Sequence, residues 1–296
     1  MIGYDGSRLS TTVQQLILSY VRGAYTYISS APELKRGQLR DILDGVVVRD
    51  RGLLQLRLGK RVAIVYAESG VDKVVSRGFI HRHGLVLDIS EYQRLGGHPR
   101  IFDDYLLTYE AFNQKFQRSA EIEPISIPDS PYTHWLTYDE IKVVKRTNGY
   151  ERLKSILNAL AVQTGKVQLY YEKASFEEMR GLLFALLELL PKEIRARLSL
   201  GMDLGTGFAV QVKLAILAGS ARPEIVSAPG SSRLLDELAM TPFEKYSMTR
   251  MNGKIAGLHR IFTRNFSLGS SPSESDAIKR ALESSDRYIG ESFNRV

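Results

Sequence analysis

The stretch from Gly181 to Leu190 constrains the fold most, because it is almost entirely apolar and too short to cross a bilayer. It holds about ten residues and one charge, Glu188, whereas a membrane-spanning helix needs about 20 apolar residues. Shortly before it, Ser175 and Glu178 have the spacing of a capping box, in which each side chain bonds the other residue's backbone amide. The pattern predicts a helix over residues 175–190, buried at the centre of a folded domain.

The rest of the second half mixes helix and strand patterns. The apolar residues of Leu153–Ala161 recur at i, i+3, i+4, i+7 and i+8, which predicts an amphipathic helix. Val167–Tyr171 has the composition of a short strand, and Pro191 ends the apolar helix. The remaining expected elements are a short helix at Lys192–Leu198, strands at Leu198–Leu204 and Phe208–Leu217, and helices at Ser232–Met240, Lys254–Phe262 and Ser273–Tyr288.

The first half has the alternation of a strand-rich domain. Apolar and polar residues alternate over Leu54–Leu58, and Gly59-Lys60 separates this segment from Arg61–Ala67, so we expect a hairpin. Val13–Tyr20 and Gly78–Ile89 are two further strand candidates. The apolar spacing of Asp103–Arg118 predicts a helix.

A proline-rich segment separates these two halves. Glu121–Thr133 contains three prolines, and because proline fixes φ and lacks a backbone donor, we expect an extended segment outside any central strand. We therefore predict an α+β protein of two packed domains. The strand-rich first domain would span residues 1–125, and the second, with its buried central helix, would span residues 126–296.

Composition narrows the class of protein without assigning a function. The chain has no cysteine, which excludes disulfides, thiolate metal sites and a cysteine nucleophile. No apolar run is long enough to span a membrane and the N-terminus does not resemble a signal peptide, so we expect a cytoplasmic protein. The formal charge of +7 is compatible with nucleic acid or an acidic protein as partner, but the basic residues are scattered, as on an ordinary solvated surface.

Common catalytic and cofactor motifs are absent from the sequence. It contains no phosphate loop, dinucleotide fingerprint, GxSxG elbow or HExxH pair, so we expect no cofactor. His81 and His83 lie two residues apart on an expected strand and would leave the same face of it. With Asp88 they could bind zinc or iron, which would make the chain a metal-dependent enzyme. The alternative is that both imidazoles are hydrogen-bonded inside a sheet.

Three parts of the chain resemble one known family. Gln14–Gly23 contains a strand ending in tyrosine-x-arginine-glycine, followed by a serine-rich turn at Ser29–Leu34. Arg77–Asp88 is similar to a strand with an arginine, a glycine and a histidine before an aliphatic run. Leu182–Pro191, with the basic residues of Arg195–Ser199 after it, is similar to an aliphatic helix, Leu-Pro, basic, strand pattern. Together these segments resemble the N-terminal and middle domains of the bacterial GTPase-associated protein one family.

The resemblance implies a non-catalytic adaptor or regulator that binds a Ras-like GTPase in a prokaryotic conflict or signalling system. Family members carry a histidine after the glycine of the first element, where this chain has Ala24 and Tyr25. A basic nucleic-acid-binding protein and a metal-dependent enzyme centred on the two histidines remain alternatives. The residues expected to bind a partner are Tyr20, Arg22, Gly23, Arg77, His81 and His83.

Overall fold

A computed structural model of the chain describes residues 10–21, 23–72, 76–116, 122–128, 167–171, 175–190, 192–205, 212 and 214–218. The chain divides into two compact units. One unit comprises Met1–Thr133 and Ala196–Phe208, and the other comprises His134–Arg195 and Ala209–Val296. Arg22 and the helices expected at Leu153–Ala161 and beyond residue 218 lie outside the described residues.

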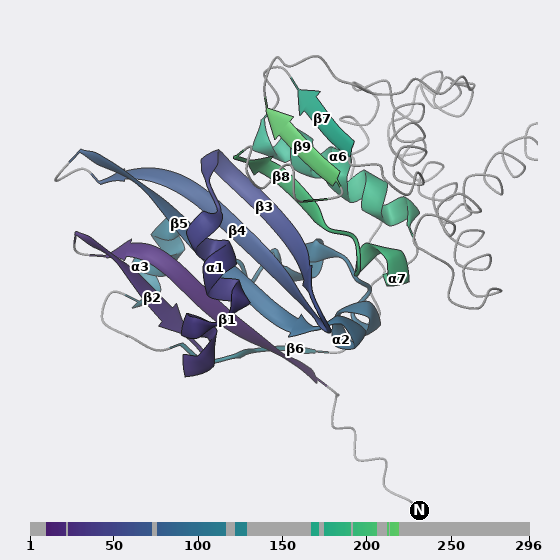
Figure 1. Cartoon of the computed structure of the whole chain (residues 1–296), viewed down its shortest axis with the longest axis horizontal. Helices are drawn as coiled ribbons and strands as arrows, with labels where there is room; N and C mark the ends of the chain where they lie inside the picture. The colour runs from purple at the N-terminus through teal and green to yellow at the C-terminus, as the bar shows by residue number, and fades with distance from the viewer. Residues whose placement is uncertain are drawn as a thin grey trace, which may run out of the picture. The chain divides into compact units, whose positions relative to one another are not determined.

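The first unit contains an antiparallel sheet in the order β2-β1-β5-β4-β3-β8, with β6 paired to the beginning of β1 (Figure 1). The strands expected from alternation are present, and the hairpin turn falls at Gly59, whose φ is +62°. The strands of this unit are β1 (Ser10–Val21), β2 (Ala24–Ser29), β3 (Val48–Leu58), β4 (Arg61–Asp72), β5 (Arg77–Asp88), β6 (Ile125–Pro128) and β8 (Leu200–Leu204).

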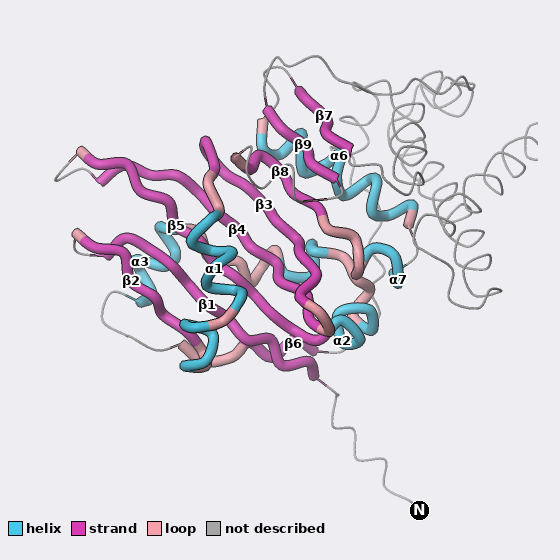
Figure 2. The backbone as a smooth tube through the Cα atoms, in the orientation of Figure 1, coloured by secondary structure: helices cyan, strands magenta, loops and turns pink. Residues whose placement is uncertain are grey.

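Short helices cover both faces of this sheet (Figure 2). Leu39 and Leu43 of α1 (Gln38–Gly45) pack on Gly84, where an added Cβ would lie within 3.0 Å of both side chains. Phe112 of α3 (Tyr109–Phe116) packs on the opposite face, in a cluster with Ile17 of β1. The remaining short helices are η1 (Pro32–Arg36), α2 (Ile89–Arg94) and η2 (Pro99–Phe102).

The helix α3 is shorter than the sequence predicted. It begins at Tyr109 rather than Asp103, because Thr108 caps it: the Ala111 N–H donates to the Thr108 side chain over 3.2 Å. Residues 103–105 form turns instead. Leu107, expected inside the helix, has its backbone bonded to side chains of the sheet.

β8 joins the sheet of the first half through a bulge in β3. Leu53 pairs with Met202 and Val48 with Leu204, so β3 uses three more residues than β8 over the same stretch. Gly52 lies in this bulge, where a Cβ would be 2.5 Å from Val48 Cγ1 and 3.0 Å from the Met202 carbonyl oxygen. The bulge therefore requires glycine at this position.

This pairing differs from the division predicted at residues 125 and 126. Both β6 and β8 follow or cross that boundary in the sequence, yet they pair with β1 and β3 of the first half. β6 does form an extended segment outside the centre of the sheet, as its prolines predicted. Pairing over such sequence separations is set by tertiary contacts, which local composition does not record.

The second unit contains the predicted buried helix, α6 (Phe176–Leu189). Its capping box is present: the Glu178 N–H donates to Ser175 Oγ over 3.2 Å, and the Ser175 N–H donates to Glu178 Oε2 over 3.0 Å. The parallel strands β7 (Val167–Tyr171) and β9 (Leu214–Ala218) and the short helix α7 (Lys192–Arg195) belong to the same unit. None of the helices described is long and apolar enough to cross a membrane.

We expect Gly52→Ala to lower the free energy of unfolding by about 1–3 kcal/mol, because the added methyl group overpacks the bulge. Gly78→Ala on β5 is the matched control, since a Cβ added there would lie 4.0 Å from the Gly70 carbonyl oxygen and overpack nothing. Urea titration of both variants measures the difference. Equal stability of the two variants would show that β8 does not pack on β3 as described.

Leu183→Ala in α6 should cost about 2–5 kcal/mol of stability, because Leu183 is fully buried and its removal leaves a cavity. Ser175→Ala should cost about 1 kcal/mol, through the lost cap alone. Denaturant unfolding of both variants measures the two losses. If α6 is buried, Leu183→Ala loses more stability than Ser175→Ala.

Candidate functional site

His81 and His83 lie side by side on β5 and are completely buried, as is Ser19 on β1. Both ring nitrogens of His81 are bonded: Nδ1 is 2.9 Å from Ser19 Oγ, and Nε2 is 2.9 Å from the carbonyl oxygen of Leu107. Both nitrogens of His83 are bonded as well. Its Nε2 is 3.0 Å from Gln15 Oε1, and its Nδ1 is 3.0 Å from the Leu107 backbone nitrogen.

These partners fix the tautomer of each imidazole. A carbonyl oxygen only accepts, so His81 carries its proton on Nε2 and accepts from the Ser19 hydroxyl at Nδ1. The Leu107 N–H only donates, so His83 accepts at Nδ1 and donates from Nε2 to Gln15. Leu107 thus has both its backbone groups held by two neutral histidines, an arrangement we call the histidine clamp.

Burial keeps both imidazoles of the clamp neutral. Desolvation of the charged form lowers the pKa of His81 to about 4, assisted by nearby Arg82 and opposed by the bond to Leu107. Desolvation likewise lowers the pKa of His83 to about 3, with a smaller contribution from His81. Neither histidine carries a charge near neutral pH.

Gln15 and Glu68 of the sheet also bond the backbone of the chain that follows α2. The amide group of Gln15 donates to the carbonyl oxygen of Glu123, in the segment that leads into β6. The Glu68 carboxylate accepts from the N–H of Tyr109, at the first turn of α3, and from the Tyr66 hydroxyl over 2.7 Å. Desolvation and the bond to Glu68 raise the pKa of Tyr66. The sheet therefore binds the chain between α2 and β6 through polar side chains.

This geometry contradicts the metal-binding and partner-binding roles expected of His81 and His83. All four ring nitrogens already bond protein groups, and neither ring reaches the surface. Within the described part of the chain, no group of three His, Cys, Asp or Glu side chains could hold a metal ion. The alternative stated from the sequence, imidazoles hydrogen-bonded inside a sheet, is the one observed.

The other expected site residues that the structure describes, Tyr20, Gly23 and Arg77, lie at one end of the sheet. Tyr20 is only 6% exposed and stacks on Phe79, with ring centroids 5.7 Å apart, so its expected contact with a partner is also corrected. Gly23 forms the β1–β2 turn with a φ of +88°, which favours glycine. Arg77 is exposed and pairs across the ladder with Asp72.

We call this region the hairpin end, where β1 and β4 end and β2, β3 and β5 begin. The described residues contain three exposed large hydrophobic side chains, Tyr25 (46% exposed), Val47 (52%) and Val71 (64%). Tyr25 is the second residue of β2, Val47 directly precedes β3 and Val71 is the next-to-last residue of β4, so all three lie at the hairpin end. They lie at the same end of three different strands, with β1 and β5 between β2 and β4.

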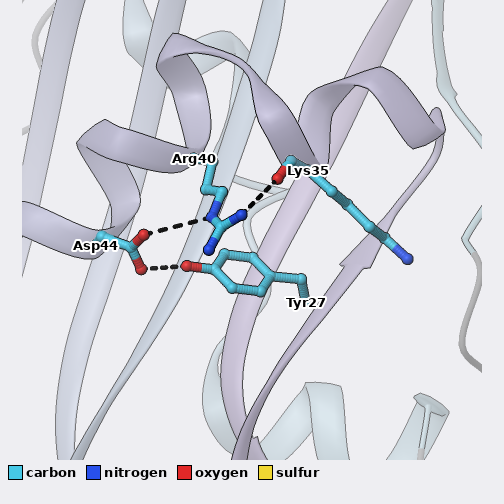
Figure 3. A network of polar contacts seen from close by, with 4 residues as sticks. All are labelled: Tyr27, Lys35, Arg40 and Asp44. Atoms are coloured by element: carbon cyan, nitrogen blue, oxygen red, sulfur yellow. Dashed lines mark hydrogen bonds and ion pairs between the residues drawn. The ribbon is translucent and has the colours of Figure 1, made fainter.

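A polar network that the sequence analysis missed lies beside β2 (Figure 3). The Tyr27 hydroxyl donates to Asp44 of α1, and the Arg40 guanidinium lies 4.9 Å from the centre of the Tyr27 ring. Arg40 also lies 3.6 Å from Asp44 and donates to the carbonyl oxygen of Lys35 over 3.2 Å. The sequence could have indicated this network, because Arg40 and Asp44 have the i, i+4 spacing of an ion pair on a helix and the apolar residues of α1 have helical spacing.

A pocket of about 400 Å³ lies at the other end of the same sheet, beside the beginning of β1. Its lining is mixed, with apolar side chains from η2 and β6 and one acidic and one basic residue. None of the site residues expected from the sequence lines it. The lining residues are Leu95, Arg100, Ile101, Asp104, Tyr105, Ile127 and Pro128.

We expect acid to destabilise the protein through the histidine clamp. In the unfolded chain each histidine binds a proton below a pKa of about 6.5, whereas the folded imidazoles stay neutral down to about 4 and about 3. Each histidine therefore removes about 1.4 kcal/mol of stability per pH unit between its two pKa values, as the pH falls below about 6.5.

Urea unfolding between pH 7 and pH 5 measures this dependence. His83→Gln is the matched variant, since glutamine keeps one donor and one acceptor but does not titrate, and its pH dependence should be shallower than the parent's. Identical pH dependence in the two proteins would contradict the neutral state of His83.

Comparison with known proteins assigns the chain to no family. No protein-family model matches the chain, and neither a curated protein nor a solved structure matches it. The resemblance drawn from short motifs is therefore an untested hypothesis. A function for this chain has to be argued from the geometry of its described residues.

Proposed function

We propose that the chain is a non-catalytic cytoplasmic adaptor that binds a Ras-like GTPase in a prokaryotic conflict or signalling system, and that the hairpin end is its binding surface. One observation carries the proposal: two of the segments that resemble the GTPase-associated family converge at this end, where the exposed apolar residues also gather. Tyr20 and Gly23 come from one segment and Arg77 from the other.

The chemistry of the hairpin end suits a protein partner. Tyr25 and Val71 offer exposed apolar surface, and Arg77 offers a planar set of donors suited to a carboxylate or phosphate. Aromatic residues and arginine are enriched in protein interfaces. Strand ends and turns hold such side chains on a rigid scaffold, which the buried aromatic stack of Tyr20 and Phe79 supports here.

The nucleic-acid alternative is less well supported by the described arginines. Arg82 is buried and donates to the Val46 carbonyl oxygen over 2.8 Å, and Arg195 is buried with its Nη1 3.7 Å from Glu188 Oε2. Arg40 pairs with Asp44. These cations bind groups of the protein itself, so they add little to a continuous basic surface for phosphates.

The proposal predicts that Arg77→Ala weakens binding of a Ras-like GTPase from the same host by about 1–3 kcal/mol, the value of a charge-assisted hydrogen bond lost at an interface. Arg57→Ala is the matched control. Arg57 is also exposed on a strand, but it lies at the opposite end of the sheet, next to the Gly59 turn. Isothermal titration calorimetry with each variant measures the affinity.

Thermal melts of the same variants separate binding from folding. The proposal requires a lowered affinity of Arg77→Ala with a melting temperature equal to that of the parent, and parent-like affinity of Arg57→Ala. If Arg77→Ala binds like the parent but melts earlier, Arg77 has a structural role and the hairpin end is not the binding surface.

A further inference from the structure

Among the strands that the structure describes, β2 is the outermost of the first unit's sheet, and β1 is the one strand with which it pairs. The Ser30 N–H donates to the Gln15 carbonyl oxygen over 2.9 Å, and in an antiparallel ladder such bonded pairs alternate with non-bonded ones. The even-numbered residues of β2 therefore bond to β1. The backbone groups of Tyr25 and Tyr27 point away from the sheet.

These outward backbone groups are available. Among the described residues, neither the N–H nor the carbonyl group of Tyr25 or Tyr27 has a hydrogen-bond partner. Their side chains are engaged instead, the Tyr25 hydroxyl accepting from the Ile80 N–H over 2.9 Å and the Tyr27 hydroxyl donating to Asp44. Both residues are thus held in an extended conformation with one edge unbonded.

β2 lacks the features by which proteins protect an exposed edge strand. Such edges usually carry a lysine, a proline or a bulge that prevents another strand from adding. The sequence of β2, Ala-Tyr-Thr-Tyr-Ile-Ser, has no charged residue and no proline, and its register with β1 runs without a bulge over all six residues. Its tyrosines, threonine and isoleucine instead favour strand pairing.

Two arginine guanidinium groups lie beside the tyrosines of this edge, on the face that α1 covers. The Arg40 guanidinium lies over the ring of Tyr27, and the Arg82 guanidinium lies 5.8 Å from the centre of the Tyr25 ring. In the described part of the chain, Asp44 is the one carboxylate that bonds this group of side chains. Arg40 is the more exposed of these two guanidinium groups, because Arg82 is buried and donates to the Val46 carbonyl oxygen.

We propose that β2 is a strand-addition site, at which an extended segment of the partner pairs with the backbone of Tyr25 and Tyr27 and places acidic side chains beside Arg40. The inference rests on the proposed function for the identity of the partner. Main-chain hydrogen bonds supply affinity in strand addition, and side chains supply specificity. Here the acidic side chains complement the partly exposed guanidinium of Arg40.

Hydrogen–deuterium exchange of the full chain tests the site directly. Two probes are used: a Ras-like GTPase from the same host, and an acetylated peptide of alternating glutamate and valine, with a lysine–valine peptide as its charge-reversed control. We expect both the GTPase and the acidic peptide to slow exchange in peptides that cover residues 24–29. The lysine–valine peptide should slow it less.

A pair of variants isolates the backbone contribution. Tyr27→Pro removes an outward N–H without removing a donor that β1 uses, whereas Tyr27→Ala removes the same side chain and keeps the N–H. Tyr27→Pro should bind each probe about tenfold more weakly than Tyr27→Ala, the effect of one lost hydrogen bond of about 1.4 kcal/mol. Melting temperatures of the two variants serve as the check on folding.

The outcomes distinguish the site from the proposed function. GTPase binding without slowed exchange at residues 24–29, and with equal affinity of the two variants, overturns strand addition and leaves the adaptor function in place. Slowed exchange with the acidic peptide but no GTPase binding upholds the strand-addition site and removes the GTPase as partner. If neither probe slows exchange, strand addition at β2 is wrong.

Discussion

The binding of Leu107 by two neutral imidazoles is the interaction on which the first unit depends. A buried backbone segment that joins no ladder needs other partners for its N–H and carbonyl groups, such as side chains or water. His83 accepts from the Leu107 N–H and His81 donates to the Leu107 carbonyl oxygen, so the two imidazoles make the hydrogen bonds that a neighbouring strand would make in a ladder. The cost of this arrangement is two imidazoles that must stay uncharged in a buried site.

The clamp also explains where partner contacts can occur. It fixes the chain that leads into α3, and α3 buries one face of the sheet through Phe112, while α1 covers the other face around Gly84. Where helices cover its faces, the described sheet remains accessible at its strand ends and along the edge strand β2. The exposed apolar residues and the unbonded backbone of β2 lie at these places.

Local patterns in the sequence predicted the elements whose cause is local. The capping box of Ser175 and Glu178, the turn at Gly59 and the alternating strands all appear, because adjacent residues determine them. The sequence did not predict that β8 pairs with β3, or that Leu107 lies outside α3 with its backbone bonded to the sheet. Both features depend on residues far apart in the sequence. The spacing of His81 and His83 predicted a shared face but could not show that Leu107, Ser19 and Gln15 would occupy every nitrogen.

The measurement that tests this account most directly is ¹⁵N NMR of the imidazole rings in the full chain, followed from pH 7 to pH 5. The clamp predicts that His81 and His83 both carry their proton on Nε2, keep Nδ1 unprotonated, and show no titration across this range. Titration of either ring near pH 6.5, or a proton on Nδ1 of His83, would contradict the clamp and return both histidines to the list of candidate functional groups.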